Sequence, residues 1–314
     1  MPYDCNFLTV SDGEHLAVHQ WIPENGIQKI IVLSHGMMEF AARYERFALK
    51  ANEQGIAVYA PDHRGHGRTA GSLSRLGIVA APRPFDRMSA DLRETVDHAS
   101  LRHPGLPVIL MGHSFGSFLA LHCIEIQGTR FSGCILSGSR GPDPIMDKAL
   151  RILSFKMSVL TGRDKPSPFL NTLAFGSCNK RIPHPATSND WLSRDEAEVA
   201  AYNASPWCGF ACSPGFYGAL GTGFATIYRK KLLQAIPEML PILLISGTDD
   251  PIGGYGVLSR KLCVRLQNAG IRNVSLSLYQ DGRHELLNDL DRDQVTQDLM
   301  SWINALPLTQ KSNL

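Results

Sequence analysis

A glycine-flanked serine at the end of an apolar run constrains the fold of this chain more than any other feature. Residues 106–118 read Leu-Pro-Val-Ile-Leu-Met-Gly-His-Ser-Phe-Gly-Ser-Phe, and a segment compatible with a helix follows at 118–126. A buried strand, a sharp turn and a helix with Ser114 at the turn form a nucleophile elbow, whose strained backbone holds the hydroxyl clear of the sheet. Gly112 and Gly116 fit this interpretation, since a side chain at either position would collide with the neighbouring strand or helix.

Strands and helices alternate along most of the sequence, after a predicted β-hairpin over residues 6–10 and 15–22. This alternation predicts right-handed crossovers and a mostly parallel central sheet flanked by helices, an α/β fold. The predicted strands are 30–33, 56–60, 108–111, 133–136, 241–245 and 274–279, and the predicted helices are 43–54, 88–103, 118–126, 257–269 and 293–305.

The alternation stops between residues 141 and 236. This stretch holds 11 of the 25 aromatic residues and no convincing buried strand. We therefore expect an inserted, largely helical cap at 141–236, which divides the α/β core into a first part at 1–140 and a second part at 237–314.

A nucleophilic Ser114 needs a base within hydrogen-bond reach and a carboxylate that orients the base. In open α/β sheets such groups lie at the carboxyl ends of strands. Two strand ends downstream of Ser114 carry suitable groups, first Asp249-Asp250 and then His284. Of the eleven histidines, only His284 follows an acid-bearing loop in the last strand-to-helix connection, so we predict that it is the base. The spacing leaves the choice between Asp249 and Asp250 open.

Acyl transfer also needs two backbone N–H donors for the oxyanion, one after the nucleophile and one in a loop after an earlier strand. Phe115 supplies the first, and Met37, in the His-Gly-Met turn after residues 30–33, supplies the second. A metal site at His284-Glu285 is excluded because residue 288 is Asn instead of the second His of His-Glu-x-x-His. No metal or organic cofactor is implied.

Taken together, these stretches resemble the monoacylglycerol lipase and lysophospholipase branch of the α/β-hydrolase superfamily, often grouped with serine-aminopeptidase-type hydrolases. The matching segments run from residue 30 to residue 290 in the family's order, and they are His35–Glu39 with Arg43-Tyr44, Asp62–Gly67, Gly112–Gly116, Ser246–Pro251 and Gly282–Glu285.

The resemblance implies an α/β-hydrolase fold and a Ser114, Asp250, His284 triad, since the family places its acid three residues after the glycine of that loop. It also implies oxyanion donors at Met37 and Phe115. Relatives often carry Met at the position after the serine, and Phe115 instead places a ring at the pocket floor. The expected reaction is hydrolysis of a small lipid ester, a monoacylglycerol or lysophospholipid, through an acyl-enzyme. A peptidase, an acyltransferase and a non-catalytic ligand receptor on the same fold are the alternatives.

Composition agrees with a globular enzyme that binds no nucleic acid. The net charge of +2 comes from 31 basic and 29 acidic residues, without a basic arm or a nucleic-acid motif. The first residues show no secretory signal, and the seven scattered cysteines favour a reducing compartment, so we expect a cytoplasmic protein. Cys208 and Cys212 lack partners at zinc spacing, which favours free, buried thiols.

The cap carries a helical apolar stripe, and seven basic residues against one acidic residue lie between Lys148 and Arg181. Such a lid suggests peripheral contact with an anionic membrane surface. A cap helix that packs on its own core, with solvated lysines, accounts for the same pattern and is the interpretation we favour. The stripe consists of residues 145, 149, 152, 153, 157 and 160.

Overall fold

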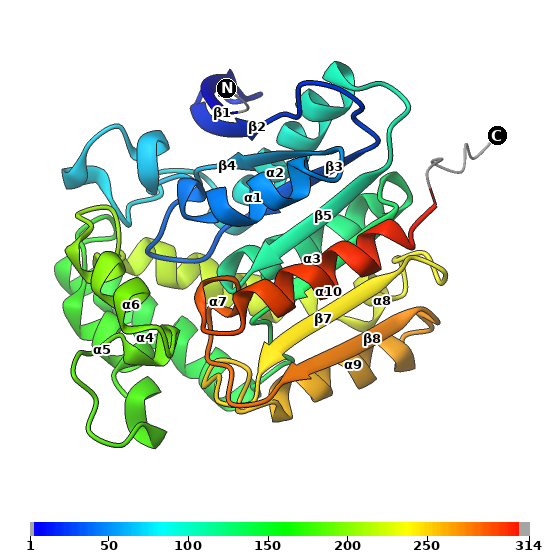
Figure 1. The fold of residues 1–314 in the computed structure, drawn as a ribbon. Coiled ribbons are helices and arrows are strands. Elements are labelled where there is room, and N and C mark those ends of the chain that lie inside the picture. The colour runs from blue at the N-terminus through cyan, green and yellow to red at the C-terminus, as the bar shows by residue number, and fades with distance from the viewer. Residues whose placement is uncertain (1–2, 308–314) are drawn as a thin grey trace.

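A computed structural model describes residues 3–307, and its centre is an eight-stranded sheet in the order β1-β2-β4-β3-β5-β6-β7-β8 (Figure 1). The hairpin of β1 and β2 is antiparallel, β2 pairs antiparallel with β4, and all further pairs are parallel. The predicted hairpin and mostly parallel sheet are therefore confirmed. The strands are β1 Tyr3–Thr9, β2 His15–Trp21, β3 Lys29–Ser34, β4 Ile56–Pro61, β5 Val108–His113, β6 Gly133–Ser137, β7 Ile242–Gly247 and β8 Val274–Tyr279.

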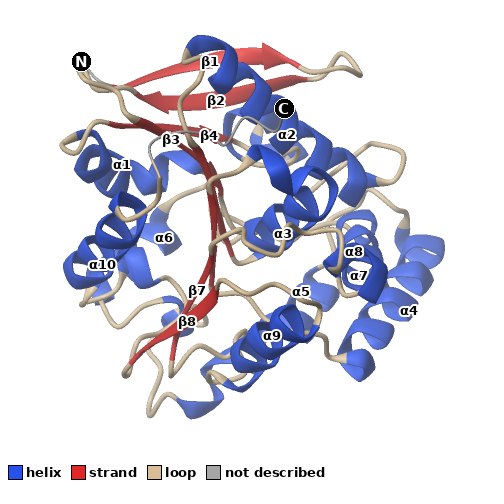
Figure 2. Cartoon of the chain, turned by 90° about the vertical axis from the view of Figure 1, so that its right-hand side faces the viewer, coloured by secondary structure: helices blue, strands red, loops and turns tan. Residues whose placement is uncertain are grey.

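Helices cover both faces of this sheet (Figure 2). Helices α1 (Glu45–Asn52) and α10 (Arg292–Asn304) bury their apolar residues against one face, and α2 (Pro84–Arg102), α3 (Phe115–Gln127) and α9 (Val257–Asn268) against the other. Strands β3 to β7 carry buried residues at every position, as expected for parallel strands covered on both faces.

Helix α2 begins four residues before the predicted start at 88. Pro84 takes the first helical position, where its fixed φ fits and its missing N–H is not needed. The low periodicity before residue 88 concealed this first turn. Helix α3 likewise begins at Phe115, three residues before the predicted start, because the chain turns into the helix directly after Ser114.

The segment between β6 and β7 lies entirely within the described residues and contains no strand. Its first helices lie beyond the carboxyl ends of the parallel strands, at the lower left of Figure 1, whereas its last helix, residues 230–233, packs on α3. The division of the chain at residues 141 and 236 stays a prediction. The helices are α4 Pro144–Thr161, α5 Pro168–Phe175, α6 Glu196–Ala204, α7 Pro214–Ile227 and α8 Lys230–Leu233.

The apolar stripe of α4 is only partly covered. Residues 149, 153 and 157 are half-buried, and α4 packs mainly on α7. The preferred interpretation, a helix packed on its own core, therefore holds for half of the stripe. Six large apolar side chains of α4 stay exposed, namely Ile145, Met146, Ile152, Phe155, Val159 and Leu160. Within residues 3–307, no helix is long and apolar enough to cross a bilayer.

Candidate active site

Ser114 is the single residue between β5 and α3, and it adopts a strained conformation. Its φ of 49° and ψ of −119° lie in a region that non-glycine residues rarely occupy, at a cost of about 1–3 kcal/mol. Neighbouring groups hold the turn, because the Ser114 N–H donates to the carbonyl of Ser137 (2.8 Å) and the Ser114 carbonyl accepts from the Ser117 hydroxyl (2.6 Å). The sequence motif therefore forms the predicted elbow.

The two glycines beside Ser114 are required by close approach of the backbone. A Cβ atom on Gly112 would lie 2.4 Å from the carbonyl oxygen of Gly116, and one on Gly116 would lie 2.0 Å from that of Ser34. Real Cβ contacts are never this short, so no side chain fits at either position. The motif's glycines thus let β5, α3 and the end of β3 meet around Ser114.

His284 and Asp250 come from the loops after β8 and β7, and the structure brings them together. Nδ1 of His284 lies 2.9 Å from Oδ1 of Asp250, and both side chains are buried. Asp250 also accepts from the N–H of Ile252 at 2.8 Å. Asp249 is exposed and makes no hydrogen bond or ion pair with His284 within residues 3–307. The difference in burial therefore distinguishes Asp250 from Asp249 as the partner of His284, whereas their spacing in the sequence does not.

The pKa values of this pair shift toward the charged forms. Burial alone would raise the pKa of Asp250, but the charge of His284 and its hydrogen bond outweigh burial and lower it. For His284, burial alone would lower the pKa, and the charge and hydrogen bond of Asp250 raise it above its usual 6.5. Asp250 therefore stays ionised and makes His284 a stronger base.

The His284 ring packs on His113, the residue before Ser114, and against Gly138. The ring of His113, the residue before Ser114, lies 4.7 Å from the His284 ring between centroids. Gly138 lies under the imidazole, since a Cβ there would be 2.9 Å from its Cε1. Ser114 Oγ and His284 make no hydrogen bond within residues 3–307; such bonds often tighten only when substrate binds.

The loop after β3 carries the predicted oxyanion donor Met37. Gly36 lies against Ser114, since a Cβ on Gly36 would be 3.4 Å from the Ser114 Cβ. The Gly36 N–H donates to Glu39 (2.5 Å) and the Met38 N–H to His66 (3.2 Å), whereas the Met37 N–H has no acceptor in the described part of the chain. The Phe115 N–H opens α3, where N–H groups lack intrahelical acceptors. Both predicted donors are therefore available.

Three buried and neutral histidines, His35, His63 and His66, support this loop. Nδ1–H of His35 donates to the Gly36 carbonyl (2.7 Å), and its Nε2 accepts from the His63 N–H (3.0 Å). His66 donates through Nδ1–H to the Arg64 carbonyl, leaving Nε2 to accept from the loop. Burial lowers the pKa of all three, to about 4 for His66. They are therefore uncharged supports and not bases.

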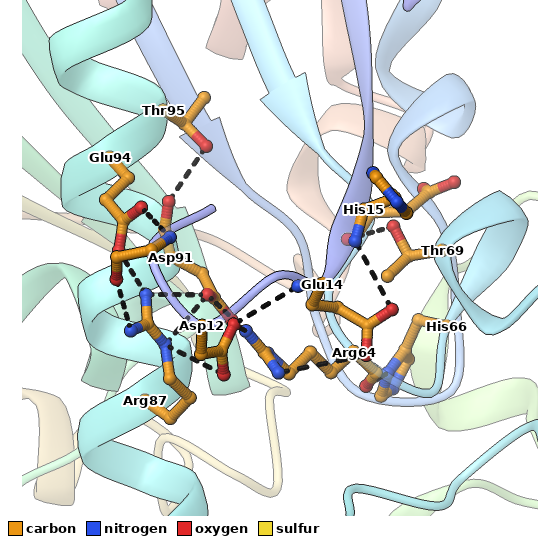
Figure 3. Close-up of polar contacts among 12 residues, drawn as sticks. Asp12, Glu14, His15, Arg64, His66, Thr69, Arg87, Asp91, Glu94 and Thr95 are labelled. Atoms are coloured by element: carbon orange, nitrogen blue, oxygen red, sulfur yellow. Dashed lines mark hydrogen bonds and ion pairs between the residues drawn. The ribbon is translucent and has the colours of Figure 1, made fainter. Parts of the chain in front are cut away.

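Arg64 anchors the segment that carries His63 and His66 (Figure 3). Its guanidinium pairs with Asp91 of α2 at 2.6 Å and with Asp12 of the β1–β2 turn at 2.7 Å. Arg64 belongs to the Asp62–Gly67 segment that carries the family resemblance, and its contacts in the structure are those of a structural residue.

A buried ion cluster joins the oxyanion loop to the histidine loop. Arg43 binds Glu285 through two N–H···O contacts of 2.7 and 2.6 Å and Glu39 at 2.8 Å. Tyr44 donates to Glu39 at 2.8 Å. Burial alone would raise the pKa of Glu285, but Arg43 lowers it to about 2. Sequence reasoning assigned none of these residues a role, because their contacts span up to 242 positions.

No group of three or more His, Cys, Asp or Glu side chains that could hold a metal ion occurs within residues 3–307. The seven cysteines are free thiols, and all except Cys5 are buried.

Comparison with known proteins gives one family. The family model described as serine aminopeptidase, S33, matches residues 25–291. The monoacylglycerol lipase of Mycolicibacterium smegmatis is 30% identical over 93% of each chain, and the human monoglyceride lipase is 26% identical over 98% of this chain and 93% of its own. A thermostable carboxyl esterase from Bacillus coagulans, solved in complex with glycerol, superposes with a TM-score of 0.89 at 27% identity over 98% of this chain and 99% of its own.

Proposed function

Because the chain belongs to the serine aminopeptidase S33 family, in the monoacylglycerol lipase-like branch of the α/β-hydrolases, we propose that it cleaves lipid esters through a triad of Ser114, His284 and Asp250. The chain is a carboxylic ester hydrolase. The proposed substrate is a monoacylglycerol or lysophospholipid. The buried 2.9 Å contact of His284 and Asp250, beside the strained Ser114, supports this proposal most directly.

In the proposed first step, His284 Nε2 takes the Ser114 proton while Oγ attacks the ester carbonyl. The N–H groups of Met37 and Phe115 hold the oxyanion of the tetrahedral intermediate. The intermediate collapses as His284 gives its proton to the leaving alcohol oxygen, which leaves the acyl chain on Ser114. Water, deprotonated by His284, then attacks the acyl-enzyme, and the acid leaves as Ser114 regains its proton.

Ser114→Ala tests this function. We expect the variant to lose hydrolysis of p-nitrophenyl esters and monoacylglycerols and to lose labelling by a fluorophosphonate, with an unchanged circular dichroism spectrum. Wild-type turnover in the folded variant would refute the nucleophile. A panel of monoacylglycerols, lysophospholipids and peptides with N-terminal proline separates the lipase from the peptidase. Added alcohol acceptors reveal an acyltransferase, and a wild-type protein without fluorophosphonate labelling would be a receptor.

We also propose that the exposed face of α4 meets a lipid surface. Phe155, Val159 and Leu160 are each at least 70% exposed, and exposed Lys148 and Lys156 lie on the same helix. Apolar and basic side chains together suit the interface of an anionic bilayer. We expect co-sedimentation with phosphatidylglycerol vesicles that weakens in Phe155→Ser/Leu160→Ser. Equal binding by the wild type and this variant would refute the contact.

A further inference from the structure

Residues 190–194 of the cap, named the strap here, are bound to the loop that carries His284. The N–H of Glu285 donates to the Leu192 carbonyl at 2.7 Å, and that of His284 to the Trp191 carbonyl at 3.4 Å. Arg283 donates to the carbonyls of Asp190 and Ser193, both at 2.8 Å. Four hydrogen bonds therefore join the strap to the histidine loop.

The strap holds Trp191 directly on the candidate base. The indole ring lies 5.0 Å from the His284 ring between centroids and stacks on Phe175 of α5 at 5.7 Å and 9°. The side chain is 4% exposed. Aromatic packing of this kind fixes the orientation of the imidazole, and a phenyl ring could provide much of it.

The indole N–H has no structural use. Nε1 of Trp191 is buried and finds no acceptor within residues 3–307, although buried polar groups are normally hydrogen-bonded. Trp191 belongs to an apolar cluster with Cys178, Leu192, Tyr202 and Cys208, against which Phe175, Ile182 and Ile252 pack. A donor left unpaired beside the reacting histidine is an arrangement that a ligand oxygen would complete.

We propose that Trp191 determines specificity by donating its indole N–H to a hydroxyl oxygen in the alcohol part of the ester. The inference rests on the proposed function, because His284 must reach the leaving alcohol oxygen to protonate it, and Trp191 packs on His284. The alcohol part is thus the section of the substrate that leaves beside His284, the ring on which Trp191 packs.

The test compares two esters of one fatty acid, the monoacylglycerol and the ethyl ester, which lacks further hydroxyls. In Trp191→Phe we expect kcat/KM for the monoacylglycerol to fall about 3- to 10-fold relative to the ethyl ester, the loss of one neutral hydrogen bond. Any loss of packing on His284 lowers both rates together and leaves their ratio unchanged. Trp207→Phe, a half-buried cap tryptophan without ring contact to His284, is the control and keeps the wild-type ratio.

An unchanged ratio in Trp191→Phe would overturn the proposal. If that variant does not fold, Trp191→benzothienylalanine keeps the ring size, replaces N–H with sulfur, and must show the same change in ratio. Failure of the proposed function is separate, because it would appear as Ser114→Ala retaining turnover of both esters.

Discussion

The guanidinium of Arg43 pairs with both carboxylate oxygens of Glu285, the residue that follows His284, at 2.7 and 2.6 Å. The same guanidinium holds Glu39, whose carboxylate accepts from the Gly36 N–H of the oxyanion loop. One buried cation therefore connects the loop that would stabilise the oxyanion with the loop that carries the base. In the proposed mechanism these two loops act on one carbonyl, so we expect the cluster to maintain their separation.

Arg43→Met should destabilise the fold strongly. It leaves Glu39 and Glu285 buried without their cation, and breaking a buried ion pair in this way costs about 3–5 kcal/mol. Urea unfolding measures the difference. The triple variant Arg43→Met/Glu39→Gln/Glu285→Gln removes the stranded charges and should recover most of the stability. If Arg43→Met alone were as stable as the wild type, this account of the cluster would be contradicted.

Activity should depend on pH through His284. Asp250 raises the pKa of His284 above 6.5, and the proposed base must be neutral. The protonated form prevails below the pKa, so kcat/KM should fall with slope one as pH drops through a midpoint above 6.5.

Asp250→Asn removes the negative charge beside His284 and the acceptor that fixes the tautomer of its imidazole. We therefore expect kcat to fall by about 10⁴-fold. Asp249→Asn is the matched control: this exposed neighbour makes no contact with His284, and its pH profile should overlay that of the wild type. An equal loss in both variants would refute the assignment of the acid.

The parts of the site predicted from sequence are those that local chain geometry dictates. Ser114 required only a strand, glycines and a helix start, and His284 followed from its strand end. The choice of Asp250 over Asp249 needed the family resemblance, because burial distinguishes adjacent acids only after folding. The contact of Arg43 with Glu285 and the packing of Trp191 on His284 join distant segments, and no local periodicity encodes them.

Glu125 of α3 should make the fold less stable as pH rises. Its carboxyl is buried and finds no hydrogen-bond partner among residues 3–307, and burial raises its pKa to about 9 from 4.5. Below pH 4.5 the Glu125 carboxyl is protonated in both the folded and the unfolded chain. Between pH 4.5 and pH 9 only the unfolded chain releases this proton, so the free energy of unfolding falls as pH rises through that range. Glu125→Gln cannot ionise and should be about 1–3 kcal/mol more stable at pH 7.

Thermal unfolding of Glu125→Gln and wild type at pH 5 and pH 8 measures this linkage. The gain in stability of Glu125→Gln over the wild type should be small at pH 5 and larger at pH 8. Ester hydrolysis should stay unchanged because Glu125 lies outside the site. A gain that does not depend on pH would show that the carboxyl is not buried as an acid.

Gly138→Ala should damage activity through His284. A Cβ at this position would lie 2.9 Å from Cε1 and 3.1 Å from Nδ1 of His284, so the imidazole must shift. A displacement of about 1 Å in a reacting group costs about 10²-fold in rate. Gly138 also has a φ of +58°, which adds about 1–2 kcal/mol of strain in alanine.

Gly105→Ala isolates the strain, because Gly105 has a φ of +79° and nothing within 4 Å of its Cβ position. Gly138→Ala should lose at least as much thermal stability as Gly105→Ala, and only Gly138→Ala should lose kcat; equal kcat in the two would mean that the imidazole tolerates the shift.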